Sequence, residues 1–404
     1  MDAKKLGKRL RAIREKNALT QEAVEKAIAL PHKAMTHVEA GVRNISSLEL
    51  SKLADLFHVP IADLFSDPIA PEEDLLVALY RAAPGIKENP IARETIARCI
   101  HLCREGAFLE KLLDLSRQHT ILSYPFPAPQ TVGDAISQGE RAADQERRRL
   151  GIGTEPIHDL LQLLTQQGIW AAGTELPAEL SGLFIHHPNI GMAILVNAKQ
   201  SHFRQRFSYA HEYAHALFDP QRTVAISNQD GVGTLIETRA NAFAAAFLMP
   251  EIGIANRLRS LGKGAPSRTR MAVFDPVKEE LTETEQRRSF QHIAPQDAAL
   301  LAHHFGVSYQ AMVHRLHSLR YFNREESHAL LQAERTGKDY LRALNLFEDV
   351  EKPANSPQDR TLKASVAHFA IEAYRREEIS RGRLLELGKL LQLPGDTLLR
   401  LALK

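Results

Sequence analysis

The segment His211-Glu-Tyr-Ala-His215 constrains this chain more than any other feature, because it has the form H-E-x-x-H. On an α-helix, a spacing of four residues brings both imidazoles onto one face, about one turn apart, so both can reach a single metal ion. Glu212 then lies beside the open coordination position of that metal, where it can accept a proton from water. The motif therefore indicates a zinc hydrolase centre with His211 and His215 as ligands and Glu212 as general base.

The same five-residue pattern also arises by chance. The alternative is a surface helix that carries two unrelated histidines among the 18 of the chain. Two observations favour the metal site, and the first is that apolar residues recur at helical spacing around the motif: Phe207, Ala210, Ala214, Leu217 and Phe218. The second is a candidate for a third ligand downstream.

That third ligand is needed because a catalytic zinc is held by three protein side chains and keeps one position open. Residues 234–250 are rich in alanine and end in Leu-Met-Pro, which predicts a second helix. Glu237 lies on this helix and Asn241 follows one turn later on the same face. We expect Glu237 to be the third ligand and Asn241 to orient a ligand histidine. The alternative for Glu237 is an exposed acid near a helix start, where the helix dipole favours negative charge.

Three blocks, in this order, resemble the ImmA/IrrE family of metallopeptidases: the motif helix, the Glu237-x-x-x-Asn241-x-Phe-Ala helix, and the later Phe305-Gly-Val-Ser308 segment that continues to Arg315-Leu. The resemblance covers roughly residues 150 to 325. It implies a small mixed α+β core of the zincin (gluzincin-like) type, with one Zn²⁺ per chain held by His211, His215 and Glu237. It also implies site-specific endoproteolysis of a protein, which in this family is often an Xre-type repressor.

A second resemblance covers residues 4–66, where short amphipathic helices follow one another. A first helix carries Leu6, Leu10 and Ile13, and Thr20-Gln-Glu opens a second. Pro31 and Gly41 bound a third stretch, and two more follow at 48–57 and 61–65. This order is similar to the five-helix, lambda-repressor-like helix-turn-helix domain of the Xre family.

That resemblance implies which residues bind DNA. Residues 31–39 correspond to the recognition helix, and the side chains expected to face the groove are His32, Lys33, Thr36 and His37. Gln21 corresponds to a position near a phosphate or a base edge. The chain departs from the family pattern, because Ala29 replaces the usual turn glycine and Pro31 the usual serine. A domain that serves only in protein docking or dimerisation therefore stays open as an alternative to DNA binding.

The rest of the chain is predicted to be mostly helical, with chemistry confined to the two domains above. The expected division is residues 1–66 for the helix-turn-helix domain, 67–150 for a helical connector with a proline-rich linker, 151–325 for the peptidase-like domain and 326–404 for a helical C-terminal region. The last region carries no recognisable chemistry and is expected to be a helical cap or a docking element.

Composition narrows the class of protein further. The net charge is only +2, so nucleic-acid affinity must be local to one part of the chain. The two cysteines, Cys99 and Cys103, are four residues apart in a helical pattern, which is typical of reduced core thiols. No long apolar run predicts a membrane span or a signal peptide, so we expect a cytoplasmic protein without membrane association.

Short strands are expected at 168–172, 182–186 and 192–197, and a strand edge beside the motif helix would suit an extended substrate backbone. A peptidase of this type also needs a donor for the developing oxyanion. The candidates are Tyr309, His314 and Arg315, and the alternative for each is a surface or packing role.

These features favour a transcriptional regulator that binds DNA and carries a zinc endopeptidase acting on a repressor or antitoxin. The alternative is a transcription factor or antitoxin whose peptidase-like domain is a non-proteolytic sensor or docking module. Helix-turn-helix domains of this type usually bind DNA as two-fold pairs, so a homodimer is an open alternative to a monomer.

Overall fold

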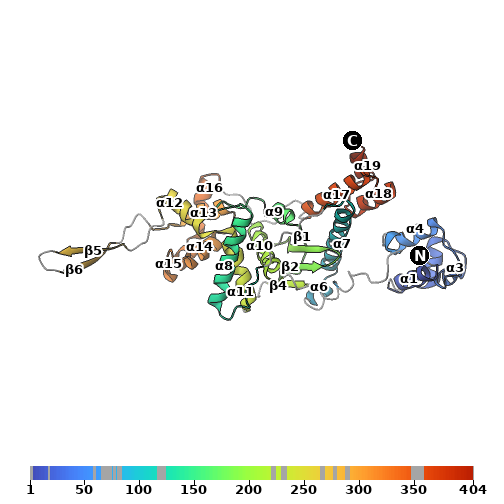
Figure 1. Ribbon diagram of the computed structural model, residues 1–404, viewed down its shortest axis with the longest axis horizontal. Coiled ribbons are helices and arrows are strands. Elements are labelled where there is room, and N and C mark those ends of the chain that lie inside the picture. The colour runs from blue at the N-terminus through green and yellow to red at the C-terminus, as the bar shows by residue number, and fades with distance from the viewer. Residues whose placement is uncertain are drawn as a thin grey trace. The chain divides into compact units, whose positions relative to one another are not determined.

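The chain divides into two units, Met1–Asp74 and Leu75–Lys404, in a computed structural model of the protein (Figure 1). The structure describes residues 3–16, 19–57, 61–64, 75, 79, 84–115, 124–219, 224–228, 234–263, 269–275, 280–286, 292–346 and 359–403. Among the helices of these residues, none combines the length and the apolar character that a membrane span requires.

The first unit is helical over its described residues. Its elements are α1 (Ala3–Lys16), α2 (Gln21–Ile28), α3 (Ala34–Glu39), α4 (Ser47–Leu56) and the 3₁₀ helix η1 (Ile61–Leu64). Side chains cap the N-termini of α2 and α4. The Thr20 hydroxyl accepts a hydrogen bond from the Ala23 amide, and Ser46 forms a capping box with Glu49. The apolar stripes meet in one core that includes Leu10, Val24, Met35, Val38, Leu53 and Leu64. Five short helices are thus confirmed, with the fifth a 3₁₀ helix.

The third helix begins later than the sequence predicts. The expected range was 31–39, with Pro31 in the first turn, but α3 starts at Ala34. Lys33 has a φ of 61° and a ψ of 8°, which is the left-handed region and cannot continue into a right-handed helix. Pro31 and His32 therefore lie in the turn that leads into α3.

The second unit contains a four-stranded mixed sheet. Its strands are β1 (Ile169–Thr174), β2 (Leu180–His187), β3 (Gly191–Asn197) and β4 (Val224–Asn228), in the spatial order β1-β3-β2-β4. β1 pairs with β3 in parallel, and β2 pairs with β3 and β4 in antiparallel fashion. The three predicted strands are present, and β4 adds an edge strand that the sequence did not indicate.

Helices account for most of the remaining described residues of this unit. In chain order they are α6 (Pro84–Glu88), α7 (Pro90–Leu112), α8 (Val132–Arg149), α9 (Leu160–Gln166), α10 (His202–Phe218), α11 (Leu235–Leu248), α12 (Glu251–Ser260), α13 (Pro295–Phe305), α14 (Tyr309–Ser318), α15 (Arg324–Gln332), α16 (Glu334–Ala343), α17 (Arg360–Arg375), α18 (Arg381–Leu390) and α19 (Thr397–Ala402). A separate hairpin joins β5 (Thr269–Asp275) to β6 (Glu280–Gln286). The mostly helical fold with a small mixed sheet is therefore confirmed.

Each face of the sheet belongs to a different hydrophobic core, because successive side chains of a strand point to opposite faces. The inner face packs against α10 and the helices around it, and contributes Ile169, Ala171, Phe184, Ile194 and Val196. The outer face packs against α7 and α17–α19, and contributes Trp170, Ala172, Leu183, Ile185, Ala193 and Leu195. The sheet is covered on both sides (Figure 1).

On the inner side, helices α8 and α11 approach each other very closely. At Gly139 of α8, an added Cβ would lie 2.5 Å from the Arg239 carbonyl oxygen and 2.8 Å from the Phe243 amide nitrogen of α11. Ala142 and Ala143 of α8 are also fully buried. Small residues on α8 therefore allow α11 to pack at this short distance.

A buried carboxylate joins α8 to the motif helix. Glu146 is fully buried, accepts hydrogen bonds from the Tyr213 hydroxyl and, at 2.7 Å, from the Tyr124 hydroxyl, and pairs with Arg149. Burial opposes ionisation, but the bonds from Arg149 and the two tyrosines outweigh it and lower the pKa of Glu146. Tyr124 belongs to segment 124–130, which has no helix or strand, as its prolines predict.

The outer core ties the C-terminal helices to the sheet. The Trp170 ring of β1 meets the Phe369 ring of α17 edge to face, with centroids 6.4 Å apart. Glu105 of α7 accepts a 2.6 Å ion-pair hydrogen bond from Arg383 of α18. Cys99 and Cys103 are buried free thiols in this core, as expected. Helices α17–α19 of the C-terminal region therefore cover the outer face of the sheet, whereas Leu330 of α15 and Leu341 of α16 belong to the inner core.

The left-handed backbone of Ala29, in the turn after α2, can be tested by substitution. It has a φ of 58° and a ψ of 45°, a left-handed conformation that costs an alanine about 1–2 kcal/mol. We expect Ala29→Gly to stabilise the first unit by up to about 1 kcal/mol, because glycine adopts this region without the steric penalty but loses more chain entropy.

Hydrogen exchange of the α2 amides in the full-length protein measures that change. Ala27→Gly is the matched control: Ala27 is exposed within α2, so this substitution should lower stability by about 1 kcal/mol. Equal losses for the two variants would contradict the left-handed assignment of Ala29.

Candidate metal centre and nucleic-acid interface

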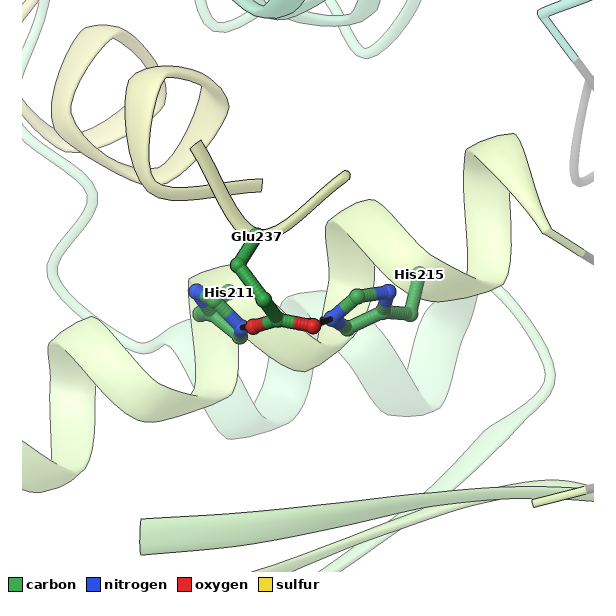
Figure 2. A group of neighbouring side chains, drawn as sticks. All are labelled: His211, His215 and Glu237. Carbon is green, nitrogen blue, oxygen red and sulfur yellow. Dashed lines mark hydrogen bonds and ion pairs between the residues drawn. The ribbon is translucent and has the colours of Figure 1, made fainter. Parts of the chain in front are cut away.

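Three side chains from two helices converge in the second unit. His211 and His215 project from α10 and Glu237 from the first turn of α11, where its amide bonds the Thr234 cap. Their nearest ligand atoms all lie within 4.8 Å of one another. Figure 2 shows the Glu237 carboxylate reaching across from α11 to both imidazoles.

The spacing of these atoms suits one small metal ion. The two Nε2 atoms are 3.2 Å apart, and Glu237 oxygens lie 3.1 Å from His211 Nε2 and 3.5 Å from His215 Nε2. A tetrahedral zinc with bonds of about 2.0–2.1 Å places its ligand atoms about 3.3 Å from one another. Two imidazole nitrogens and one carboxylate are also a donor set that zinc accepts. The residues present therefore fit such an ion in both geometry and chemistry.

Hydrogen-bond acceptors behind the imidazoles favour the same orientation. His211 Nδ1 lies 2.9 Å from Asn241 Oδ1, and His215 Nδ1 lies 3.4 Å from Asp219 Oδ2. With a proton on each Nδ1, both Nε2 lone pairs face the centre. Asn241 is thus placed where the sequence predicted an orienting residue.

Asp219 is a residue that the sequence analysis missed. It ends α10 and also accepts from the Arg239 guanidinium of α11 at 3.2 Å and 3.4 Å. The Arg239 guanidinium in turn lies 4.3 Å from the centroid of the Phe218 ring. The sequence held a signal for Asp219, because an acid four residues after the second histidine lies on the same face of the helix.

The electrostatics of the cluster reflect its burial and its carboxylates. Burial lowers the pKa of His215, but Asp219 and Glu237 outweigh that effect and raise it to about 9. Burial raises the pKa of Glu237, but hydrogen bonds and charge from His211 and His215 hold it well below its usual value. The carboxylate is therefore ionised, as a metal ligand must be.

Glu212 follows His211 on α10 and packs against the sheet. It is fully buried, and an added Cβ at Gly182 of β2 would lie 2.6 Å from Glu212 Oε1 and 2.9 Å from its Cγ. The pairing of β2 with β4 shifts register between Leu180 and Gly182. That shift places Leu180 in the outer core with Leu183, whereas Gly182 faces α10 by the ordinary alternation of side chains along β2. A glycine in β2 thus makes room for Glu212, which the sequence did not reveal.

The three oxyanion candidates are not brought together at the cluster. The Tyr309 hydroxyl donates to the Leu330 carbonyl at 2.9 Å, a contact between α14 and α15 that favours the packing alternative for this residue. Arg315 is buried and donates to Glu140 and, at 3.2 Å, to the Met249 carbonyl. His314 is exposed at a cavity described below. None of the three has a described contact with the three-residue cluster.

In the first unit, a polar network holds α3 against α1 and α2. Arg14 pairs with Glu39 at 2.6 Å, and Gln21 donates to the same carboxylate at 2.7 Å. The Thr36 hydroxyl donates to the side-chain amide oxygen of Gln21 at 2.9 Å. Burial and the Glu39 carboxylate act in opposite senses on Arg14, and the hydrogen bond to Glu39 dominates and raises its pKa. Gln21 therefore binds α3 at two residues, Thr36 and Glu39.

The residues predicted to face DNA share one property, which is exposure to solvent: His32, Lys33, Thr36 and His37. The opposite side of α3 is buried through Met35 and Val38. A further residue that sequence reasoning missed is Glu25, whose buried carboxylate accepts from the Lys33 amide at 3.2 Å and the Met35 amide at 2.9 Å. It caps α3 from outside the helix.

Comparisons with known families bear on both units. The helix-turn-helix model matches residues 10–64, and the model of the IrrE N-terminal-like domain matches residues 165–266. The chain fuses a helix-turn-helix domain to an IrrE-like domain. The first domain implies DNA binding, and the second is of a metallopeptidase family, so both resemblances seen in the sequence are confirmed. The three clustered residues lie within the IrrE-like match.

Two solved structures align over most of the fusion at low identity. PlcR of Bacillus thuringiensis, in complex with the peptide PapR7 and DNA, is 12% identical over 96% of this chain and 93% of that chain, with a TM-score of 0.17. ComR from Streptococcus suis is 11% identical over 100% and 97%, with a TM-score of 0.16. Such TM-scores do not establish a common fold. A search of curated proteins found no match.

Proposed function

We propose that this protein is a DNA-binding transcriptional regulator whose IrrE-like domain is a zinc-dependent, site-specific endopeptidase. The observation that carries the proposal is the set of separations among His211, His215 and Glu237, each between 3.1 Å and 3.5 Å. Two histidines and one carboxylate at such distances leave one tetrahedral position for a reacting group, as in catalytic rather than structural zinc sites.

In this proposal His211, His215 and Glu237 hold one Zn²⁺ per chain, and Asn241 and Asp219 fix the imidazoles through their Nδ1 protons. When bound, the zinc ion supplies Lewis acidity for hydrolysis of a peptide bond. Glu212 takes a proton from the attacking water, whose oxygen bonds to the carbonyl carbon. It then delivers that proton to the leaving nitrogen as the C–N bond breaks. Gly182 leaves the space in which this carboxylate is held.

The substrate is proposed from the family resemblance to be a repressor or antitoxin with its own Xre-type domain. The described edge strand β4 offers a place for an extended substrate backbone beside the sheet. Domain limits near residues 66, 150 and 325 belong to the same proposal, and within residues 326–404 helices α17–α19 form a cap on the outer face.

For DNA, the proposal assigns His32, Lys33, Thr36 and His37 to the major groove. The exposure of Thr36 and His37 on α3, and of His32 and Lys33 in the turn before it, supports this assignment. The anchoring of the buried side of α3 by the core and by Glu39 supports it as well. Gln21 holds Thr36 and lies at the edge of the same surface.

The metal assignment makes a prediction about zinc content. His211→Ala should lower zinc from about one per chain to a small fraction, because two remaining ligands bind zinc far more weakly than three. Mass spectrometry of metals after dialysis measures it. His202→Ala is the matched control, because His202 is exposed at the start of the same helix and should leave zinc content unchanged. Full zinc occupancy in the His211 variant would exclude this site.

The general-base assignment separates metal binding from catalysis. Glu212→Gln should retain zinc and lower cleavage of a candidate repressor by at least about a hundredfold, since a positioned general base contributes 10²–10⁴-fold. Gly182→Ala should also retain zinc and lower cleavage, because its Cβ would displace the Glu212 carboxylate. Intact mass measurement of the repressor reports cleavage. If Glu212→Gln abolishes cleavage but leaves regulation intact, proteolysis is not the function; intact cleavage would instead exclude Glu212 as the general base.

The DNA assignment predicts a change in salt dependence. Lys33→Asn removes a charge and keeps a residue type that tolerates the left-handed backbone at this position. Affinity for the promoter should fall, and the slope of log K against log salt should drop by about one. Lys52→Gln, at an exposed position of α4, should leave the slope unchanged. Equal slopes for both variants and the native chain would contradict contact by Lys33.

A further inference from the structure

A cavity of about 680 Å³ lies among α8, α10, α11 and α14 in the IrrE-like unit. Its apolar lining comes from Ile136, Phe203, Phe207, Ala245, Met249 and Ala311. Ligand cavities in proteins typically span about 300–1,000 Å³, so this one is large enough for several side chains. Asn241 is the one residue of the proposed metal centre and DNA surface that lines it.

The cavity adjoins the metal cluster through one shared residue. Asn241 lines the cavity, and its Oδ1 lies 2.9 Å from His211 Nδ1. On α10, Phe203 and Phe207 come eight and four residues before His211, so they lie on the same face of that helix. The cavity therefore lies along the same face of α10 as His211, nearer to the N-terminus of this helix.

A second contact links the cavity to the general base. Arg204, also in its lining, donates to the Ser181 hydroxyl at 3.4 Å. Ser181 precedes Gly182, against which Glu212 is packed. An occupant of the cavity thus lies next to Asn241, which contacts His211, and next to Arg204, which bonds the residue before Gly182.

The chemistry of the lining favours an apolar occupant. The buried guanidinium of Arg315 is satisfied by Glu140 and by the Met249 carbonyl, so this charged pair is compensated within the protein. The alanines of the lining leave the volume open, and the two phenylalanines offer apolar surface whose burial is favourable.

We propose that this cavity binds apolar side chains of the protein substrate beside the scissile peptide bond, and so sets the cleavage specificity. The inference rests on the proposed endopeptidase function. It assigns Phe207, Ala245 and Ala311 to substrate recognition, and it makes Asn241 the residue that joins the recognition cavity to the metal cluster.

The first experiment measures binding without cleavage. The background is the zinc-loaded, full-length Glu212→Gln protein, and the probe is acetyl-leucyl-phenylalanine amide, followed by NMR titration. Ala311→Phe, which places a ring in the cavity, should weaken binding at least tenfold. Ala329→Phe makes the same change at an exposed position of α15 and should leave binding unchanged.

A second cavity variant distinguishes filling of the cavity from misfolding of the Ala311→Phe protein. Ala245→Leu fills the cavity from α11 with a smaller side chain and should weaken the probe in the same direction. Zinc content and circular dichroism should match the parent in all variants. Binding that is absent in the parent, or equal in the parent and both filled variants, overturns the cavity proposal whatever the cleavage assays give.

The second experiment tests specificity with a mixture of random peptides and the native catalytic residues. Apolar residues should be enriched at a fixed position beside the cut, and Ala311→Phe should remove that enrichment. Cleavage without an apolar preference, or with a preference that Ala311→Phe leaves intact, overturns the cavity proposal and leaves the endopeptidase standing. A native protein that cuts neither peptides nor a candidate repressor overturns the proposed function instead, and with it the assignment of the occupant as a substrate.

Discussion

The close approach of α8, α10 and α11 is the constraint on which the candidate metal centre depends. Two histidines from α10 can meet Glu237 only if α11 lies at one distance and one rotation from α10. Gly139 of α8 admits the backbone of α11 to contact distance, and the buried alanines of α8 keep that contact free of gaps. Glu146 then fixes α8 to α10 through the Tyr213 hydroxyl within the motif. A displacement of α11 relative to α10 would change both distances between Glu237 and the two histidines.

Features set by local spacing could be predicted from the sequence. The positions of His211 and His215 on one helical face follow from their separation of four residues, and the pairing of Glu237 with Asn241 follows from the same rule. The start of the second helix at Thr20 could also be predicted, because the capping hydroxyl and the amide that it accepts from are only three residues apart. The family models confirm the two domains. The roles of the individual site residues remain predictions that the geometry supports.

Features that depend on contacts between distant segments could not be predicted from the sequence. The place of Glu212 depends on its packing against Gly182 of β2, a contact between two distant segments that no local pattern marks. Tyr309 and Arg315 looked like free donors because their partners, Leu330 and Glu140, come from other helices. Lys33 looked helical, since its left-handed backbone depends on capping by Glu25 from α2.

The outer face of the sheet shows why distant segments matter to the site. β2 carries Gly182 and Phe184 toward α10 and carries Leu183 and Ile185 toward α7 and α17. Each large apolar side chain buried there contributes roughly 1.5–3 kcal/mol, and this energy holds β2 in register. Because a slip of one residue would exchange the two faces, the C-terminal helices help determine which residue of β2 meets Glu212. A region without recognisable chemistry of its own thereby helps to fix the position of the general base.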